Sequence, residues 1–448
     1  MIPVSIEDII KAVDGTVISK IENSKVDKIT TDSRSKDGGM FIALKGENFD
    51  GNDFATEYLK DNQSVIVSKT IPSMENKNII YVENTSVALI KLAGYYRSLF
   101  DIPVIGITGS VGKTSTKEMI ASVLCQSFGT MKTQGNFNNE IGVPLTLFNL
   151  EDHHNCAVVE MGMSNFGEMS RLTSAVKPNI AVITNIGTSH IGNLGSRENI
   201  LKAKLEILEG MNENSLVVLN ADNDLLFGLK GKLPFKQIYF GIENKDADIV
   251  AQDVKVSGEM VTFNALGTQF TINAPGSHHV LNALAGIVIG QHLGMTLEKI
   301  KDGIMQFENC GMRQNIIKYG EITIIEDCYN ASLDSMKASL KVLKDISKGK
   351  TIAVLGDILE QGDFAFDTHK TLGEVVSKNK IDLLLTLGES CKITADTASS
   401  LGVTSHSFDT HEEIAQYLKK HIKPEDTILF KGSRGMKLEK VIQLYMKG

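Results

Sequence analysis

The chain has 448 residues, 42% of them hydrophobic and 22% charged, and a formal net charge of −8 at pH 7. This length exceeds what one ordinary hydrophobic core organises, so we expect about three domains. A mild negative charge over such a length argues against a broad surface for nucleic acid or anionic membranes, although it allows a local basic pocket for phosphates.

Five cysteines are scattered along the chain and never form a Cys-x-x-Cys pair. This usage is typical of a reducing cytosol and predicts neither disulfides nor a thiolate metal site. The first residues lack a basic start followed by an apolar run, and no apolar run reaches the roughly 18 residues that a membrane helix needs. We therefore expect a cytoplasmic protein without membrane insertion.

Residues 1–100 predict a small α/β domain. Short apolar runs predict strands at 39–44, 64–68 and 78–82, and a helical pattern extends from about residue 86 to residue 100. Pro103 ends this pattern because the residue before a proline avoids the helical region. We therefore place a domain boundary at residue 100.

Residues 101–312 predict a central, mostly parallel sheet. Its expected strands, apolar throughout and separated by helices, span 104–108, 156–160, 180–184 and 215–219. Strict alternation between residues 254 and 272 instead predicts an antiparallel hairpin around Gly267, appended to the sheet. A helix is expected from about residue 279 to residue 292.

Residues 313–448 predict a second α/β sheet. Strands are expected at 322–326, 351–355, 383–387 and 427–430, and each is followed by a helical pattern. This alternation is typical of a doubly wound, Rossmann-like domain.

A glycine-rich turn follows the first central strand and opens a helix. Such a turn predicts a phosphate-binding loop, in which backbone N–H groups approach phosphate oxygens and the helix N-terminus adds partial positive charge. Ile107 stands where the usual loop motif has glycine, so a plain strand-to-helix turn is the alternative. Lys113 can reach the β and γ phosphates, and the Thr114 hydroxyl can bind Mg²⁺. The candidate ATP-binding residues here are Thr108, Gly109, Ser110, Val111, Gly112, Lys113, Thr114 and Ser115.

The loop Thr-Gly-Ser-Val-Gly-Lys-Thr resembles the nucleotide loop of the Mur ligase family. Three later segments strengthen the resemblance: residues 133–144, which include Asn138 and Asn139, the strand end at Glu160, and residues 185–190, which end at His190. All three follow expected strands, at the edge where open α/β sheets form their ligand crevice. The resemblance extends over the whole chain and implies three domains.

Metal ligation is expected at two of these strand ends. Glu160 and Thr114 supply the hard oxygen ligands that Mg²⁺ prefers, while His190 is a less typical ligand that would serve a second Mg²⁺. Taken alone, a glutamate at a strand end is most often solvated or ion-paired, and a loop histidine is most often merely exposed. Their order behind the phosphate loop favours the functional interpretation.

Lys204 resembles a family lysine that is often carbamylated by CO₂, which turns a cation into an anionic Mg²⁺ ligand. The spacing of residues reveals no such modification, and Lys202 leaves the register open. The alanine before Lys204 and the glutamate two residues after it favour Lys204. The resemblance implies that Lys113, Glu160, His190 and Lys204 are the catalytic residues.

Nucleotide contacts are also implied by the later segments. Residues 276–283 resemble a family segment whose asparagine, here Asn282, contacts adenine, with His279 in place of the usual Asn or Met. Helix capping by Ser277 or His278 is the alternative. The resemblance further implies that the C-terminal domain contacts the nucleotide through Arg313, Asp327, Tyr329 and Asn330.

Substrate contacts are implied in the first and last domains. In the last domain, residues 355–362 and 431–439 resemble family loops, although Ser332 and Leu333 depart from the neighbouring family pattern. A basic, glycine-containing turn after a strand favours an anion contact over a solvated loop. The expected substrate-binding residues are Ser33, Arg34, Lys45, Asn52, Phe54, Asn138, Asn139, Asp357, Lys431 and Arg434.

The resemblance implies a ligase that uses ATP and two Mg²⁺ ions to join D-alanyl-D-alanine to a UDP-N-acetylmuramoyl tripeptide through an acyl phosphate. It implies a monomer with these two substrates as its partners. The alternatives are the sister ligase that adds the third amino acid, a folylpolyglutamate synthase, and a relative that binds nucleotide without catalysis. The hundred residues before the phosphate loop argue against the folate enzyme, and the four expected catalytic residues argue against an inactive relative.

Overall fold

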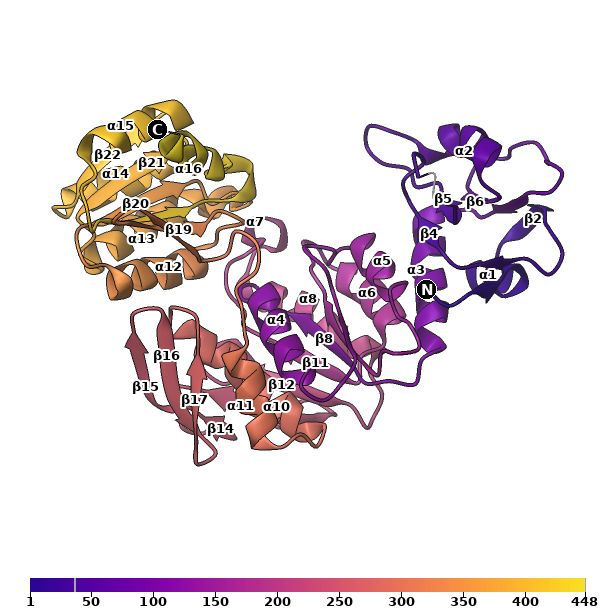
Figure 1. Ribbon diagram of the computed structural model, residues 1–448, viewed down its shortest axis with the longest axis horizontal. Helices are drawn as coiled ribbons and strands as arrows, with labels where there is room; N and C mark the ends of the chain where they lie inside the picture. Colours follow the sequence, from indigo (N-terminus) through magenta and orange to yellow (C-terminus); the bar gives the residue numbers. More distant parts are fainter. Residues whose placement is uncertain (36–37, 448) are drawn as a thin grey trace. The chain divides into compact units, whose positions relative to one another are not determined.

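The computed structural model describes residues 1–35 and 38–447. The chain forms two compact units. The first comprises residues 1–108, 128–182 and 204–216, and the second comprises residues 109–127, 183–203 and 217–448. Figure 1 labels many of the helices and strands, which are numbered in chain order. The domain boundaries at residues 100 and 312 stay predictions.

The N-terminal sheet has five strands in the order β2-β7-β6-β5-β4. Neighbours from β4 to β7 are parallel, and β2 is antiparallel to β7. The three predicted strands and the last predicted helix are present. The strands are β2 (Thr16–Ser19), β4 (Ile29–Thr30), β5 (Met40–Ile42), β6 (Ser64–Val67) and β7 (Asn78–Tyr81), and the helices are α1 (Ile6–Val13), α2 (Ala55–Asp61) and α3 (Thr85–Ser98).

The central sheet has seven strands in the order β14-β13-β12-β11-β8-β10-β9. Strand β10 is parallel to both β8 and β9, and β13 is parallel to β14. The four predicted strands are confirmed, and each is fully buried. The strands are β8 (Val104–Thr108), β9 (Thr130–Lys132), β10 (Cys156–Glu160), β11 (Ile180–Ile183), β12 (Leu216–Asn220), β13 (Lys236–Gly241) and β14 (Ile249–Val250).

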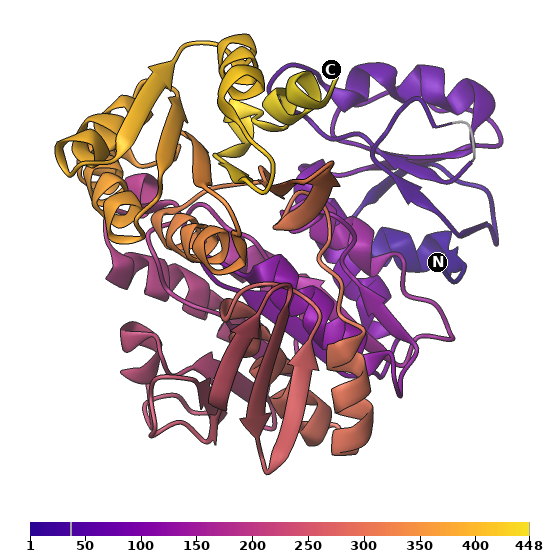
Figure 2. The same ribbon diagram turned by 60° about the vertical axis from the view of Figure 1, so that its left-hand side comes forward.

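The predicted hairpin is confirmed, and it belongs to a separate three-stranded antiparallel sheet, visible in Figure 2. Strands β16 (Met260–Ala265) and β17 (Thr268–Ile272) pair with Phe263 opposite Phe270. The third strand, β15 (Gln252–Ser257), was not predicted. Its side chains are half-buried or exposed, so its sequence carries little of the apolar alternation that reveals a strand.

The C-terminal sheet has six strands in the order β18-β19-β23-β20-β21-β22. Five are parallel, but the edge strand β18 is antiparallel to β19, so the sheet is mixed. The four predicted strands are confirmed, while the two exposed edge strands were missed. The strands are β18 (Asn315–Tyr319), β19 (Ile322–Asp327), β20 (Thr351–Gly356), β21 (Leu383–Leu387), β22 (Thr404–Phe408) and β23 (Thr427–Lys431).

Helices cover both faces of the C-terminal sheet (Figure 1). Leu340 of α12 (Leu333–Ile346), Leu372 of α13 (Ala365–Lys378) and Ala398 of α14 (Cys391–Ser400) pack in one core with Leu355. On the other face, α15 (His411–His421) and α16 (Glu439–Met446) pack in a second core. Burial of both sheet faces accounts for the continuous apolar runs in the central strands.

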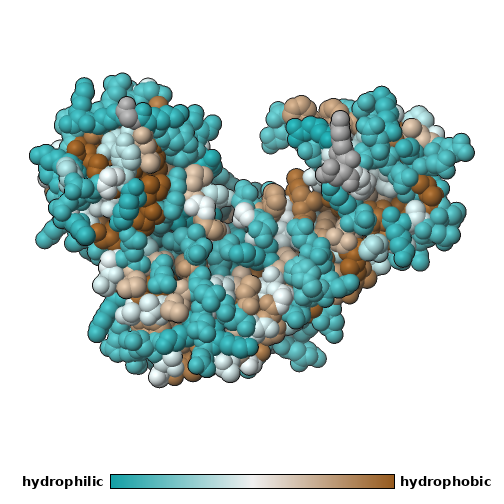
Figure 3. Space-filling model, in the orientation of Figure 1, coloured by the Kyte–Doolittle hydropathy of each residue, from teal (hydrophilic) through white to brown (hydrophobic). Residues whose placement is uncertain are grey.

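The remaining helices belong to the middle of the chain. They are α4 (Lys113–Leu124), α5 (Gly142–Leu147), α6 (Glu168–Val176), α7 (Ile191–Leu194), α8 (Arg197–Leu205), α9 (Asp224–Phe227), α10 (His278–His292) and α11 (Leu297–Met305). Among the described residues, no helix combines the length and apolar character needed to cross a membrane. The face shown in Figure 3 is mostly hydrophilic, with scattered apolar residues.

Candidate nucleotide-binding site

Residues 108–114, here called the phosphate loop, connect β8 to α4. The loop needs glycine at two positions because Gly109 has φ +151° and Gly112 has φ +83°. A Cβ on Gly109 would lie 1.9 Å from the Thr184 hydroxyl oxygen, which leaves no room for a side chain. The predicted turn therefore has the backbone that close approach to a ligand requires.

The segment after β11 holds the phosphate loop in place. The Thr184 hydroxyl donates to the Val111 carbonyl at 2.6 Å, and the Asn185 side-chain oxygen accepts from the Val111 N–H at 2.8 Å. The Ser110 hydroxyl accepts from the Gly187 N–H at 3.0 Å. Sequence reasoning assigned this segment to His190 alone and missed the supporting role of Thr184 and Asn185. Two polar residues directly after a buried strand were the available signal.

Lys113 and Thr114 begin α4 directly behind the loop. The Lys113 ammonium donates to the Gly109 carbonyl at 2.8 Å, so the side chain folds back over the loop. Thr114 is buried, while Ser115 is half-buried. The first N–H groups of a helix lack intrahelical acceptors and carry partial positive charge, which makes this turn suitable for phosphate oxygens.

Glu160 and Asn138 are brought together at the end of β10. Glu160 is 1% exposed, and its side-chain oxygen accepts from the Asn138 amide at 2.7 Å. Strand pairing places Glu160 opposite Ile107, two residues before Gly109 in the chain. Asn139 differs, because its side-chain oxygen accepts from backbone N–H groups at the start of α5. A buried carboxylate at this strand end fits the oxygen ligand predicted for Mg²⁺.

His190 and Lys204 have distinct surroundings. His190 has φ +62°, and its Nδ1 lies 2.6 Å from a carboxylate oxygen of Glu360, in the loop after β20. Lys204 is 1% exposed on α8, whereas Lys202 is exposed. Burying an ammonium is costly unless it is compensated, so the contrast favours Lys204 as the lysine with a specific role.

Asn282 of α10 contacts the helix that the phosphate loop opens. Its side-chain oxygen accepts from the Thr116 hydroxyl at 2.9 Å, and its amide nitrogen lies 3.3 Å from Nδ1 of His279. All three residues are buried. The predicted adenine contact therefore lies in a fixed hydrogen-bonded arrangement next to α4.

The predicted C-terminal nucleotide contacts form one cluster around Asp327. The Lys431 ammonium donates to the Asp327 carboxylate at 2.7 Å and to the Asn330 carbonyl at 3.1 Å. The Arg313 guanidinium lies 4.0 Å from the centre of the Tyr329 ring, a cation–π contact. Lys431, which was predicted from a different segment, thus contacts Asp327 and Asn330 at the ends of β19 and β23.

Asp357 and Arg434 lie in other contacts. The Asp357 carboxylate accepts from the Cys391 N–H at 2.7 Å at the start of α14, and Arg434 pairs with Glu439 at 2.9 Å. Asp357, His369 and Cys391 bring three potential metal ligands within 4.8 Å of one another. However, the His369 Nε2 accepts from the backbone N–H after Asp357, and burial raises the pKa of the Cys391 thiol. This cluster therefore fits a hydrogen-bonded core.

The predicted substrate residues of the N-terminal domain differ in their exposure and in their hydrogen bonds. Arg34 is exposed and pairs with Asp32, while Lys45 and Phe54 are exposed. Ser33 is half-buried. Asn52 is buried, and its amide bonds to Asp50, to both the backbone and the hydroxyl of Ser68, and to the N–H of residue 69. In this conformation Asn52 holds its own loop together.

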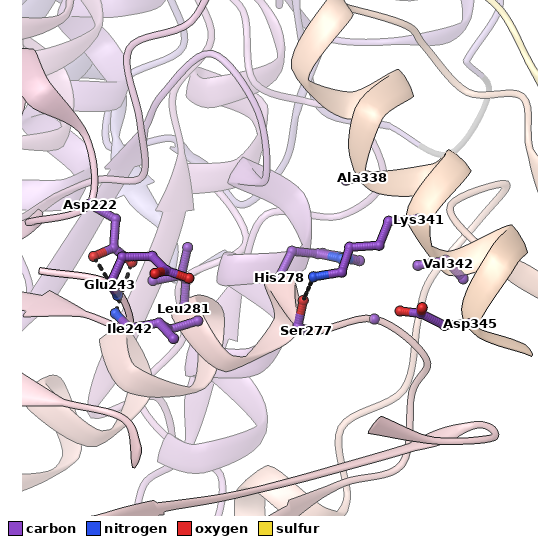
Figure 4. Close-up of a pocket in the computed structure, with 11 residues that line it drawn as sticks. Asp222, Ile242, Glu243, Ser277, His278, Leu281, Ala338, Lys341, Val342 and Asp345 are labelled. Carbon is purple, nitrogen blue, oxygen red and sulfur yellow. Dashed lines mark hydrogen bonds between the residues drawn. The ribbon is translucent and has the colours of Figure 1, made fainter. Parts of the chain in front are cut away.

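A cavity of about 300 Å³ lies beside the start of α10 (Figure 4). The Lys341 ammonium points to the Ser277 hydroxyl at 3.3 Å, next to the His278 ring. Burial lowers the pKa of His278 to about 4, so its imidazole is neutral at pH 7. The cavity is lined by Asp222, Ile242, Glu243, Gly276, Ser277, His278, Leu281, Ala338, Lys341, Val342 and Asp345.

Comparison with known proteins identifies two family domains. Residues 107–290 match the Mur ligase middle domain, and residues 312–434 match the Mur ligase glutamate ligase domain. The chain is 38% identical to UDP-N-acetylmuramoyl-tripeptide–D-alanyl-D-alanine ligase of Bacillus subtilis, with 99% of this chain and 98% of the relative covered.

Solved structures agree with this similarity over the whole chain. The crystal structure of MurF from Acinetobacter baumannii superposes with a TM-score of 0.92 at 30% identity and covers 100% of this chain and 99% of that one. MurF from Thermotoga maritima in complex with ADP has a TM-score of 0.84 at 28% identity, with 94% and 97% covered. Full-length identity above 30%, together with the phosphate loop and its supporting contacts, shows that this chain belongs to the Mur ligase family.

Proposed function

We propose that this protein joins D-alanyl-D-alanine to the terminal carboxylate of a UDP-N-acetylmuramoyl tripeptide, with ATP converted to ADP and phosphate. The main structural support for the use of ATP is the phosphate loop, which has two positive-φ glycines and the Lys113 side chain folded over it. The B. subtilis relative, aligned over 98% of its length, is named for this reaction. The product serves the synthesis of peptidoglycan.

The reaction needs an activated carboxylate because a free carboxylate is a poor electrophile. The γ-phosphoryl group passes from ATP to the tripeptide carboxylate and forms an acyl phosphate. The amine of D-alanyl-D-alanine attacks the acyl carbon, and the tetrahedral intermediate collapses to the amide and inorganic phosphate. Lys113 and the first N–H groups of α4 stabilise the phosphoryl charge during transfer.

Two Mg²⁺ ions complete the proposed site. Thr114 and Glu160 would supply oxygen ligands for one, and His190 would hold the other together with Lys204 if that lysine is carbamylated. When bound, the ions neutralise phosphate charge and polarise the phosphoryl oxygens. Asn138 orients Glu160 through the 2.7 Å hydrogen bond, and Glu360 orients the His190 ring. Lys204 is buried and Lys202 is exposed, so the proposal assigns this role to Lys204.

Nucleotide and substrate recognition are assigned to the remaining residues. In this proposal Asn282 contacts adenine, and Arg313 contacts the phosphates. Asp327 holds the ribose, with Tyr329 and Asn330 lining the nucleotide. The residues proposed to contact the substrates are Ser33, Arg34, Lys45, Asn52, Phe54, Asn138, Asn139, Asp357, Lys431 and Arg434.

The protein is proposed to act as a cytoplasmic monomer. The five cysteines, all within the described residues, form no disulfide, and three of them are buried, which suits a reducing compartment that also supplies ATP. Light scattering of the purified protein would measure its molar mass. A stable dimer would contradict the proposed monomer and leave the proposed reaction intact.

A mass-spectrometric assay tests the reaction directly. The protein is incubated with ATP, Mg²⁺, UDP-N-acetylmuramoyl tripeptide and D-alanyl-D-alanine, and the product mass should equal tripeptide plus dipeptide minus water. Omission of ATP serves as the control. Turnover with a free amino acid as acceptor, and none with the dipeptide, would contradict the proposal.

The role of Lys204 is tested against a matched lysine on the same helix. Lys204→Ala should lose most activity and regain part of it with added formate or chloride, while Lys202→Ala should keep wild-type activity. Full activity of Lys204→Ala without added anions would contradict the proposed metal ligand.

A further inference from the structure

Four buried polar side chains form a continuous group beside the phosphate loop, here called the base cluster: Thr116, His279, Asn282 and Gln314. Thr116 donates to the Asn282 oxygen at 2.9 Å, and the Asn282 nitrogen lies 3.3 Å from His279 Nδ1. His279 packs against Phe307, with ring centres 5.2 Å apart. The imidazole is thus held by both polar and apolar contacts.

The hydrogen-bond roles within the base cluster follow from chemistry. An amide nitrogen only donates, so the Nδ1 atom of His279 accepts from Asn282, and the proton of a neutral imidazole lies on Nε2. Burial and the neighbouring His278 ring lower the pKa of His279 well below its ordinary value, so the imidazole is neutral at pH 7. This neutral form suits the acceptor role of Nδ1.

The Asn282 amide retains half of its hydrogen-bonding capacity. Its oxygen has two lone pairs, one of which Thr116 uses, and its nitrogen has two protons, one of which His279 uses. One acceptor site and one donor proton of the amide therefore remain. This pattern is complementary to the amino group at position 6 and the nitrogen at position 7 of adenine.

Thr116 alone cannot fix the orientation of that amide. A hydroxyl both donates and accepts, so Thr116 tolerates either the oxygen or the nitrogen of Asn282. When Gln314 holds the imidazole proton on Nε2, the Nδ1 lone pair of His279 accepts from the amide nitrogen and repels the amide oxygen. His279 therefore distinguishes the two amide orientations. The Thr116 hydroxyl then donates or accepts according to the orientation that His279 has set.

We propose that His279 is a positioning residue that fixes the Asn282 amide and thereby selects adenine over purines with an oxygen at position 6. The inference rests on the proposed contact between Asn282 and the base. With the amide fixed, its free oxygen faces the amino group of adenine but opposes the oxygen of hypoxanthine. A freed amide can turn its N–H toward that oxygen, which lowers the preference for adenine. Its own oxygen then faces the nitrogen at position 7, so the preference does not reverse.

Gln314 completes the base cluster. The Nε2 atom of His279 and the side-chain oxygen of Gln314 each lack a hydrogen-bond partner although both are buried. A donor and an acceptor are thus both unsatisfied, and the Gln314 side chain is close enough to oppose the lowering of the His279 pKa. In the proposed arrangement, a small rotation of Gln314 pairs the two atoms and holds the Nε2 proton in place.

The test compares ADP with inosine diphosphate, which differ at position 6 of the base. Dissociation constants for both are measured by calorimetry on wild type, His279→Phe and His279→Asn. Phenylalanine retains a ring against Phe307 but offers no acceptor, so the preference for ADP should fall about tenfold. Asparagine places an oxygen near the position of Nδ1, so His279→Asn should retain the preference.

Two outcomes would overturn the inference. One is an unchanged ratio of the two dissociation constants in His279→Phe, and the other is an equal loss of preference in both variants. If His279→Phe does not fold in a thermal-denaturation control, His279→Leu replaces it, with the same expected loss. A rise in both dissociation constants at a constant ratio would show packing alone and would count against the proposal.

Asn282→Ala separates this inference from the proposed function. If wild type binds no ADP, the proposed function itself fails. If Asn282→Ala changes the ratio but His279→Phe does not, Asn282 reads the base without His279, and only the inference fails. The inference predicts that both variants lose the preference.

Discussion

The phosphate loop and the base cluster are neighbours that are organised by different means. The phosphate loop depends on backbone geometry, with two positive-φ glycines and supporting bonds from Thr184 and Asn185. The base cluster depends on side chains from α4, α10 and the segment before β18. Backbone geometry recognises a phosphate that all nucleotides share, whereas oriented side chains are needed to distinguish one base from another.

The largest expected effect is the loss of Lys113. Lys113→Ala should lower turnover by on the order of 10²–10³-fold, because one charged donor to the transferring phosphoryl group is removed. Phosphate release measures the effect, and Lys301→Ala, an exposed lysine on α11, provides the control. Near-normal turnover of Lys113→Ala would show that the phosphate loop does not take part in phosphoryl transfer.

A single methyl group at Gly109 should disrupt the phosphate loop through its backbone. Gly109→Ala combines φ +151° with a Cβ 1.9 Å from the Thr184 hydroxyl, and the strain should cost about 1–3 kcal/mol of unfolding free energy. Urea denaturation measures the loss of unfolding free energy, and ADP binding measures the effect on the phosphate loop. Gly267→Ala is the control because its φ is +73° but its Cβ would meet open space. Equal losses in the two variants would show that the steric contact contributes nothing.

Acid should act on the α10 histidines and not on the phosphate loop. The folded-state pKa of His278 is about 4, below the ordinary value of 6.5, mainly because the ring is buried. As the pH falls, the unfolded chain therefore binds this proton before the folded protein does. Above pH 6.5 His278 does not change the free energy of unfolding, and between pH 6.5 and pH 4 its protonation lowers that free energy. The loss is on the order of 1 kcal/mol per pH unit within that window.

The acid effect is measured by urea denaturation between pH 7 and pH 4.5. His278→Gln should reduce the slope of unfolding free energy against pH. The same slope in His278→Gln and wild type would show that His278 is not the group that titrates.

The smallest expected effect is at Thr116. Thr116→Val keeps the shape of the side chain but removes the hydrogen bond to Asn282, which should weaken ADP binding by about 1 kcal/mol, roughly fivefold. Tripolyphosphate, which has no base, should bind Thr116→Val and wild type equally. Weaker tripolyphosphate binding would show that Thr116 supports the phosphate loop as well.

Much of this site could be predicted from sequence because its residues follow buried strands. Glu160 ends a strand of the central sheet and Asp327 ends a strand of the C-terminal sheet, and within each sheet the parallel strands bring such ends to one edge. The edge strands β15, β18 and β22 could not be predicted, since half-exposed strands carry a weak apolar pattern. The sequence also did not predict the antiparallel direction of β18, which depends on pairing with β19.

The sequence by itself determined the parallel strands, the phosphate loop and the family, because buried apolar runs and glycine-dependent turns are local features. Tertiary structure decided which polar atoms meet. It separated buried Lys204 from exposed Lys202, paired His190 with Glu360, and placed His279 beside Asn282. Hydrogen-bond partners are chosen by distance in space, which residue spacing along a chain does not specify.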